Sequence, residues 1–403
     1  MLKVIHLSTT DTVGGAARAA FRMHESLRGK IDTKMLVYLK YSNEPSVIGL
    51  YKNNWFNRRR FLFRRLLDKA PLFFHIGFKK GLAFSPGWLR GPRKIFKIIA
   101  QENPDIIHLH WFNRGFLSIK DLLRLEKLNK PIFWTFHDMW PLTGGYHYEQ
   151  DRVECLAKIT AKIFQKKLDV YSQLPLHILA PSHWLEKKAR ASSLFSQATV
   201  QQFAYSINTD FYQPIDRIKA KRHLGIDIEQ KVVLYGATQA LTDSRKGFKY
   251  LQKALEYLVE DNILLLIFGA DDLPGQKLPV ATKFLGNIKN EAELPMIYSA
   301  SDVFVGPSLE DNLPNTFLEA AACGVPSIGF AVGGIQDIIV SGESGYLAKY
   351  KNSQSLAQSI RTVLQHATPD YLRQRSRELA VDRYSYPLQA ERLIQLYKKV
   401  IKN

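Results

Sequence analysis

The fold is decided by a stretch that reads KVVLYGATQALTDSRKGFKYLQKALEYL, residues 231–258. Its first five residues are apolar or β-branched, apart from the leading lysine, and predict a strand that is buried on both faces. A loop rich in turn residues follows and ends at Gly247, and Phe248–Leu258 then places apolar residues at helical spacing. A strand, a loop and a covering helix are the repeating unit of parallel α/β sheets.

The same unit recurs along the 403-residue chain. The expected strands are Leu2–Leu7, Met35–Leu39, Asp105–His108, Pro131–Phe136, His177–Ala180, Lys231–Tyr235, Ile263–Phe268, Asp302–Val305 and Val325–Phe330. We therefore predict an α/β protein with an N-terminal domain over residues 1–205, a second domain over 206–385 and a last helix over 386–403. The turn residues at 206–210 mark the boundary between the two domains.

The composition limits the class of protein. Hydrophobic residues make up 46% of the chain and charged residues 23%, which excludes disordered and fibrous proteins. The two cysteines are too few for a disulfide scaffold and fit a reducing compartment. There is no apolar run of about 18 residues, and MLKVIHLSTTD is too short for a secretory signal. We expect a soluble cytoplasmic protein whose formal charge of +19 attracts an anionic partner.

Residues 51–100 depart from the repeating pattern. They hold thirteen Lys and Arg residues, eleven aromatic residues and a single acid, Asp68. Basic residues interleaved with large apolar ones predict an amphipathic element on an anionic membrane surface, which would make the protein peripheral at the inner face of the membrane. Two alternatives remain. One is a solvated basic face with its aromatic residues in the core; the other is binding of single-stranded nucleic acid, for which no further motif is present.

Two loops that follow strands carry phosphate-binding features. Gly14 and Gly15 lie between the first strand and a helix from about Ala16 to Leu27, where backbone N–H groups can approach a ligand oxygen. The spacing is neither GxGxxG nor GxxxxGK(S/T), so a structural turn is an equal alternative. The second loop presents Arg245 and Lys246 at the start of a helix, where an anion between them would offset the unfavourable positive charge.

The third such loop reads PSLEDNLPNTFLEA, residues 307–320. Pro314 suits the first position of a helix that should run through Ala322. Asn315, Thr316 and Phe317 would then have free N–H groups that form an anion site.

The same loop supplies three acids. Glu319 could accept hydrogen bonds from a vicinal diol such as a ribose, while Glu310 and Asp311 precede the helix and face the same opening. A glycosidase acid–base pair made of Asp311 and Glu319 is disfavoured, because eight helical residues span about 12 Å and such pairs lie about 5–9.5 Å apart.

Together these motifs resemble the retaining glycosyltransferases of family four, which have the two-domain GT-B fold. The match also includes 105–110 (DIIHLH), 208–211 (NTDF), 333–335 (GGI) and 342–347 (GESGYL). Within the family, the chain is most similar to colanic-acid and exopolysaccharide transferases, through 134–141 (WTFHDMWP) and 312–315 (NLPN). The resemblance implies two Rossmann-like domains that face each other across a cleft, with a C-terminal helix that crosses back to the first domain.

The resemblance also implies roles for individual residues. Arg245 and Lys246 would neutralise the diphosphate leaving group, Asp311 would face the donor sugar, and His110 would sit beside the anomeric centre. The family motif of two acids separated by seven residues falls on Asp311 and Glu319; whether Glu310 or Asp311 reaches the sugar stays open. The implied donor-binding residues are Gly14, Gly15, Glu310, Asn312, Asn315, Thr316 and Glu319.

The predicted function is transfer of a sugar from a nucleoside diphosphate to a glycan or lipid-linked hydroxyl in surface polysaccharide biosynthesis, with retention at the anomeric carbon. We expect no cofactor, no nucleic-acid partner and no metal, since Cys155 stands alone in a region where relatives often carry several cysteines and no Asp-x-Asp motif is present. Two alternatives remain: a nucleotide-sugar epimerase of the same fold, and a non-catalytic membrane- or polysaccharide-binding protein.

Overall fold

The computed structural model describes residues 1–72, 83–236, 241–273, 275 and 277–402. The described chain divides into two compact units. Unit 1 holds residues 1–205 together with the chain from Ala390 onward, and unit 2 holds Ser206–Gln389. The expected loop at 236–247 and the basic aromatic segment at 51–100 lie partly outside the described residues, at 237–240 and 73–82.

Seven described strands of unit 1 form a parallel sheet in the order β3-β2-β1-β4-β5-β6-β7. Their bounds are β1 (Lys3–Thr10), β2 (Asp32–Leu39), β3 (Val47–Tyr51), β4 (Ile106–Leu109), β5 (Ile132–Thr135), β6 (Leu176–Ala180) and β7 (Thr199–Gln202). In the register, Val4 of β1 lies opposite Ile106 of β4 and Thr33 of β2.

Helices cover both faces of this sheet because its central strands are apolar on both sides. One face packs against α1 (Gly15–Leu27) and against α15 (Tyr386–Lys402), whose Leu393 and Tyr397 join the same apolar cluster as Met23 of α1. The other face packs against α2 (Trp55–Lys69), α4 (Arg93–Glu102), α5 (Leu122–Glu126), α6 (Ala157–Tyr171) and α7 (His183–Arg190). The C-terminal helix therefore completes the core of the unit that contains the N-terminus.

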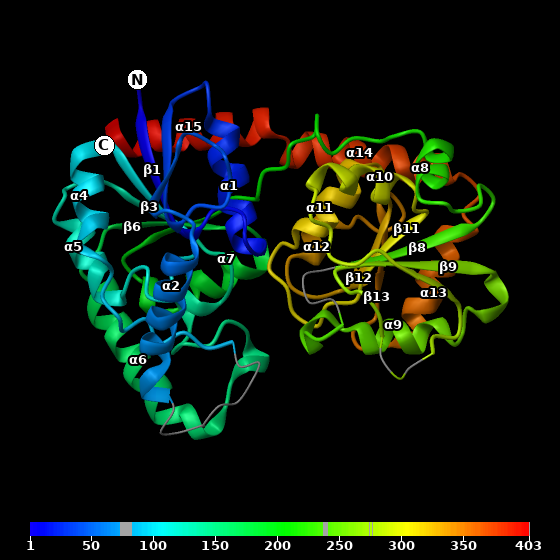
Figure 1. Ribbon diagram of the computed structural model, residues 1–403, viewed down its shortest axis with the longest axis horizontal. Helices are drawn as coiled ribbons and strands as arrows, with labels where there is room; N and C mark the ends of the chain where they lie inside the picture. The colour runs from blue at the N-terminus through cyan, green and yellow to red at the C-terminus, as the bar shows by residue number, and fades with distance from the viewer. Residues whose placement is uncertain (73–82, 237–240, 274, 276, 403) are drawn as a thin grey trace. The chain divides into compact units, whose positions relative to one another are not determined.

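Unit 2 repeats the plan with six described strands in the order β10-β9-β8-β11-β12-β13. They are β8 (Lys231–Gly236), β9 (Ile263–Phe268), β10 (Ala281–Phe284), β11 (Val303–Gly306), β12 (Ser327–Phe330) and β13 (Gly345–Ala348). On one side of the sheet lie α9 (Phe248–Leu255) and α13 (Ser353–Leu364); on the other lie α10 (Leu294–Ser299), α11 (Asn315–Ala322) and α14 (Pro369–Tyr384) (Figure 1). Two shorter or peripheral helices complete the unit, α8 (Arg217–His223) and α12 (Ile335–Ile338).

The predicted fold class is confirmed: both sheets are parallel and covered by helices, and all nine expected strands are present. Four strands were missed, namely β3, β7, β10 and β13, and each forms an edge of its sheet. The predicted helix at 248–258 ends earlier, at Leu255. Pro314 is the residue before helix α11 rather than its first residue, since its ψ of 125° is extended.

Both sheets reverse their strand order at one point. In unit 1 the reversal lies between β1 and β4, and in unit 2 between β8 and β11. Ligands of open α/β sheets bind beyond the carboxyl ends of the strands at such points. The loops that follow these four strands are therefore the places to examine for function.

Candidate functional site

The loops after β8 and β11 contact each other at the carboxyl edge of the unit 2 sheet. The N–H of Leu309 donates to the carbonyl of Arg245 at 2.7 Å, and the guanidinium of Arg245 donates to the carbonyl of Glu310 at 2.8 Å. Two segments that are 65 residues apart in sequence are thereby joined through Arg245.

Gly247 allows this approach. Its φ is +71°, and a Cβ added there would lie 1.9 Å from the carbonyl oxygen of Pro307. A side chain at this position would therefore collide with the backbone of the loop after β11. The glycine holds the short helix over Ser244–Lys246 against that loop.

Asp311 lies at the centre of the site. One oxygen of its carboxylate, Oδ2, accepts from the Lys246 ammonium at 2.7 Å and from the Arg245 guanidinium at 3.3 Å. Burial alone would raise the pKa of this carboxyl, but the two neighbouring cations outweigh burial and lower it. Asp311 is therefore ionised at neutral pH.

Lys246 is in the opposite situation. Burial, followed by repulsion from Arg245, lowers the pKa of its ammonium, while Asp311 only partly offsets these effects. Arg245 also forms an ion pair with Asp243 at 3.0 Å. The two cations thus share one central carboxylate, and a further anion would favour the charged form of Lys246.

Glu319 lies on α11 and is almost fully buried. Its Oε2 accepts a hydrogen bond of 2.8 Å from the hydroxyl of Tyr298 on α10. The tyrosine fixes the direction of the carboxylate and supplies one of its donors. This places the acid where sequence analysis expected it, on the helix that follows the loop of Asp311.

The start of α11 differs in one respect from the prediction. The N–H of Phe317 is not free, because it donates to the carbonyl of Pro314 at 3.1 Å. This bond follows from Pro314 standing outside the helix, so that its carbonyl accepts the first intrahelical bond. Asn315 and Thr316 are half-buried at the helix start, and Asn312 is buried in the preceding loop.

In unit 1 the paired glycines occupy the turn between β1 and α1. Gly14 precedes the helix with φ at +95°, and a Cβ added there would meet no atom within 4 Å. The glycine is therefore required by backbone conformation and not by crowding. Gly15 is the first residue of the helix.

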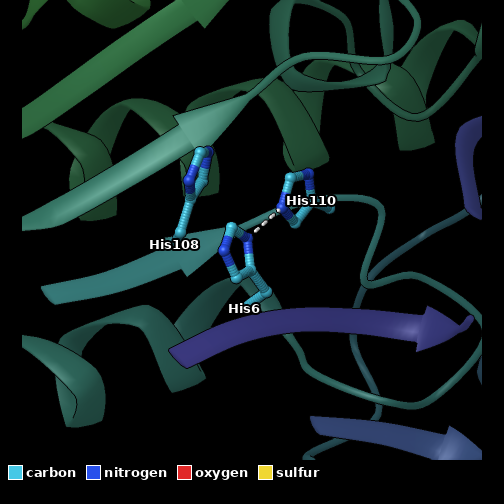
Figure 2. A group of neighbouring side chains, drawn as sticks. All are labelled: His6, His108 and His110. Carbon is cyan, nitrogen blue, oxygen red and sulfur yellow. Dashed lines mark hydrogen bonds between the residues drawn. The ribbon is translucent and has the colours of Figure 1, made fainter. Parts of the chain in front are cut away.

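His110 follows β4 and is buried among other histidines. Its Nε2 lies 2.9 Å from Nδ1 of His6 (Figure 2). Its Nδ1 lies 3.1 Å from Nε2 of His137. His137 continues to the hydroxyl of Tyr205 at 2.9 Å. We call His6, His110, His137 and Tyr205 the histidine chain. A hydrogen bond between a ring nitrogen of His110 and a sugar would require one of these hydrogen bonds to break.

Burial makes these rings poor bases. It lowers the pKa of His6 and His110 well below the ordinary value, and that of His137 to about 4. A cavity of about 10 Å³ lies beside His110 and His137, with room for about one water molecule.

His6, His108 and His110 form a group whose positions could suit a metal ion. Their bonds favour another explanation. The nitrogens of His108 meet Tyr397 at 2.5 Å and Thr135 at 2.8 Å, so both are already engaged. Two nitrogens on one tetrahedral Zn²⁺ would lie about 3.3 Å apart, whereas those of His6 and His110 are separated by the 2.9 Å of a hydrogen bond. The residues fit a hydrogen-bonded cluster better than a metal centre.

Four residues of these clusters were not predicted from the sequence, namely Asp243, Tyr298, His6 and Tyr205. Asp243 carried a weak signal in the sequence, because it stands two residues before Arg245. In the structure its carboxylate accepts a hydrogen bond from the Arg245 N–H at 3.0 Å. Tyr298 and His6 carried none, because their partners are 21 and 104 residues away along the chain.

Comparisons with known proteins bear on the family and the fold of the chain. Residues 13–193 match the family described as Glycosyltransferase Family 4, and residues 230–366 match the Glycosyl transferases group 1. Sucrose-phosphate synthase from Thermosynechococcus elongatus has a similar fold, with a TM-score of 0.71 at 18% identity and 99% of each chain covered. HepE from Anabaena, solved with UDP and glucose, has a TM-score of 0.65 at 16% identity over 99% of this chain and 100% of its own. The expected GT-B fold is confirmed by these neighbours.

Curated relatives extend over most of the chain. The D-inositol 3-phosphate glycosyltransferase of Corynebacterium aurimucosum is 30% identical over 316 residues, which are 73% of this chain and 71% of the relative. The phosphatidyl-myo-inositol mannosyltransferase of Mycobacterium leprae is 25% identical over 307 residues, 73% and 74% of the two chains. With the fold, the paired loops and these matches in agreement, the chain belongs to the group 1, family 4 glycosyltransferases.

Proposed function

We propose that the protein transfers a sugar from a nucleoside diphosphate to a hydroxyl of a glycan or lipid-linked acceptor, with retention at the anomeric carbon, in the synthesis of a surface polysaccharide. The observation that carries the proposal is the pair of cations, Arg245 and Lys246, that share the carboxylate of Asp311 at the strand-order reversal of unit 2.

The charges of this cluster fit a diphosphate. Arg245 offers a planar fork, and Lys246 offers a compact charge whose burial is only partly compensated. A phosphate oxygen that reaches Lys246 would take over the role of Asp311 and relieve the cost of burying the ammonium. HepE, which was solved with UDP-glucose, has the same fold and supports a nucleotide-sugar donor.

The remaining residues take positions around the leaving group. Glu319, oriented by Tyr298, would accept hydrogen bonds from the ribose, and Asn312, Asn315 and Thr316 would contact the donor at the helix start. Either Asp311 or Glu310 would bind the hydroxyls of the sugar. In unit 1, Gly14 and Gly15 would face the phosphates and the acceptor, while His110 would lie near the anomeric carbon.

Transfer with retention then needs no protein nucleophile. As the bond from the anomeric carbon to the diphosphate breaks, the acceptor oxygen attacks from the same face, and a leaving phosphate oxygen takes the acceptor proton. Arg245 and Lys246 stabilise the negative charge that develops on the diphosphate, which is the electrostatic form of catalysis. We expect no metal to be required, so activity in excess chelator should equal activity without it.

The test compares Arg245→Ala and Lys246→Ala with Lys249→Ala, whose exposed lysine lies in the next helix. A screen of UDP, GDP and ADP sugars by thermal shift first identifies the donor. Each of the two site variants should then lower kcat by about 100-fold or more, and the control should leave it unchanged. NMR of the product reports the anomeric configuration. Near-normal turnover in both site variants, or inversion of the anomeric centre, would contradict the proposal.

A further inference from the structure

Helix α2 presents an apolar face outward. Large apolar side chains recur on it at helical spacing, with Trp55, Leu62 and Leu66 forming one stripe and Phe56, Phe63 and Leu67 the next. All six side chains are exposed, from 44% for Leu67 to 67% for Phe56. Stripes of this kind normally face a protein core. Here they point away from it.

The opposite side of α2 explains this orientation. Phe61 and Asp68 lie seven residues apart, on one face, and are the buried residues of the helix. The Asp68 carboxylate accepts from the N–H groups of Trp88 and Leu89, each at 3.1 Å. Arg64 donates to the carbonyl of Gly115 at 2.9 Å. These contacts anchor the helix to unit 1 and fix which face is exposed.

Cations surround the exposed apolar face. Arg58, Arg59 and Arg60 are exposed, Arg65 is half-buried, and Arg59 stacks over the ring of Trp55 at 4.0 Å. Asp68, the one acid within α2, is buried, so no carboxylate of this helix offsets the arginines at the surface. Burial, followed by repulsion from Arg65 and Arg114, lowers the pKa of Lys69, which shows that positive charge accumulates here.

We propose that α2 docks on an anionic lipid bilayer, with its outward aromatic and leucine side chains in the interfacial region and its arginines on the lipid phosphates. The outward apolar stripes match the acyl boundary, and the cationic border matches anionic headgroups. Among the described residues, no helix is long and apolar enough to cross a membrane, so contact through α2 would be peripheral. The inference rests on the proposed function only in that a lipid-linked acceptor would be met at such a surface.

The experiment measures binding of the full chain to vesicles, which needs neither donor nor acceptor. Vesicles of phosphatidylcholine with phosphatidylglycerol are compared with vesicles of phosphatidylcholine alone. We expect strong preference for the anionic vesicles and weaker binding at high salt. Replacing Arg58, Arg59 and Arg65 with Gln should lower partitioning about 100-fold, since each cation contributes about a fivefold factor near an anionic surface.

A matched control separates this site from the net charge of +19. It replaces with Gln the residues Arg392, Lys398 and Lys399, which are exposed cations of the same unit on α15, the helix that covers the face of the sheet opposite to α2. The control should keep its partitioning within about threefold of the original, because charges beyond a Debye length of about 8–10 Å from the docked surface are screened. Equal losses in the two triple variants would overturn the proposal.

Two further variants test insertion. Phe63→Ser together with Leu66→Ser should abolish vesicle binding while circular dichroism stays unchanged. Brominated acyl chains should quench the tryptophan fluorescence of the original protein more than that of Trp55→Phe. The proposal fails if the protein binds neutral and anionic vesicles equally. It also fails if the original protein is a dimer that does not bind vesicles and the serine variant is a monomer, because α2 would then be a dimer interface. Binding of single-stranded DNA that depends on α2, in place of vesicle binding, would likewise overturn it. Arg245→Ala should lose sugar transfer but bind vesicles as the original protein does. A failure of the membrane proposal can therefore be told apart from a failure of the proposed transfer reaction.

Discussion

Replacing Asp311 with Asn tests the charge arrangement of the site directly. The substitution keeps the shape of the side chain but removes the charge that Lys246 contacts at 2.7 Å and Arg245 at 3.3 Å. Breaking a buried ion pair by neutralising one partner costs about 3–5 kcal/mol, and we expect the lower end because the amide oxygen still accepts a hydrogen bond. With a urea m-value of about 2 kcal/mol/M, a loss of about 3 kcal/mol lowers the unfolding midpoint of unit 2 by about 1.5 M.

The same substitution should affect ligand binding in the opposite direction. Asp311 and a diphosphate compete for the same cations, so the Asn variant should bind a nucleoside diphosphate at least as tightly as the original protein. At 100 times the dissociation constant, the nucleotide restores about 2.7 kcal/mol of stability. Asp261→Asn is the control, since it breaks the ion pair of Asp261 with Arg361 in the same unit and should cost less than about 1 kcal/mol.

Urea titrations with and without nucleotide, followed by intrinsic fluorescence, give both quantities. The reasoning is refuted if Asp311→Asn is as stable as the original protein. It is also refuted if a nucleoside diphosphate stabilises the variant less than the original, because the cations would then depend on Asp311 to bind.

Three further changes have defined outcomes. Tyr298→Phe removes the donor to buried Glu319 and should cost about 1.5–3 kcal/mol in urea unfolding and weaken nucleotide binding, whereas Tyr346→Phe should do neither. Gly247→Ala should abolish transfer because its Cβ would meet the Pro307 carbonyl at 1.9 Å. Gly342→Ala is the control, since its φ is also positive, at +85°, but no atom lies within 4 Å of the added Cβ. Thermal unfolding should show a loss of only about 1–2 kcal/mol for this control, from backbone strain. Burial lowers the pKa of His24 and His137 to about 4 and that of His108 to about 3. As the pH drops from 6.5 towards 4, these histidines are therefore protonated in the unfolded chain before they are protonated in the folded one, and the stability of unit 1 should fall. Urea midpoints that do not change with pH in this range would contradict this expectation.

The interior strands of both sheets could be predicted from sequence because most of them are runs of apolar residues, although His6 and His108 interrupt β1 and β4. β9 (Ile263–Phe268) was predicted at its observed bounds, and β8 and β11 within one residue. The edge strands have one neighbour and are only partly buried, as the exposed and half-buried residues of β10 (Ala281–Phe284) show. The sequences of β10 and β7, ATKF and TVQQ, therefore carry neither a continuous apolar run nor a helical spacing. Strand pairing with β9 alone determines β10.

The residues of the site could be predicted only where they are neighbours in the sequence. Adjacent Arg245 and Lys246, and the acids at 310–311, were visible as charged residues after strands. The ion pair that joins them depends on β8 and β11 being neighbours, which no local pattern encodes. Tyr298 shows the limit, since its one polar atom meets Glu319 only after α10 and α11 have packed together.

The histidine chain has a consequence for proton order. Each neutral imidazole carries one N–H. Every hydrogen bond of the chain therefore has a donor only if all three rings donate in the same direction along the chain. Among the residues that the structure describes, Nε2 of His6 has no hydrogen-bond partner. A buried nitrogen lone pair without a partner is less costly than a buried N–H without one. The favoured order is therefore that His6 donates to His110, His110 to His137, and His137 to the oxygen of Tyr205. A change of tautomer in one ring would require the same change in the other two. The tautomer of a ring on the first strand is thereby tied to Tyr205, the residue at which the first unit gives way to the second.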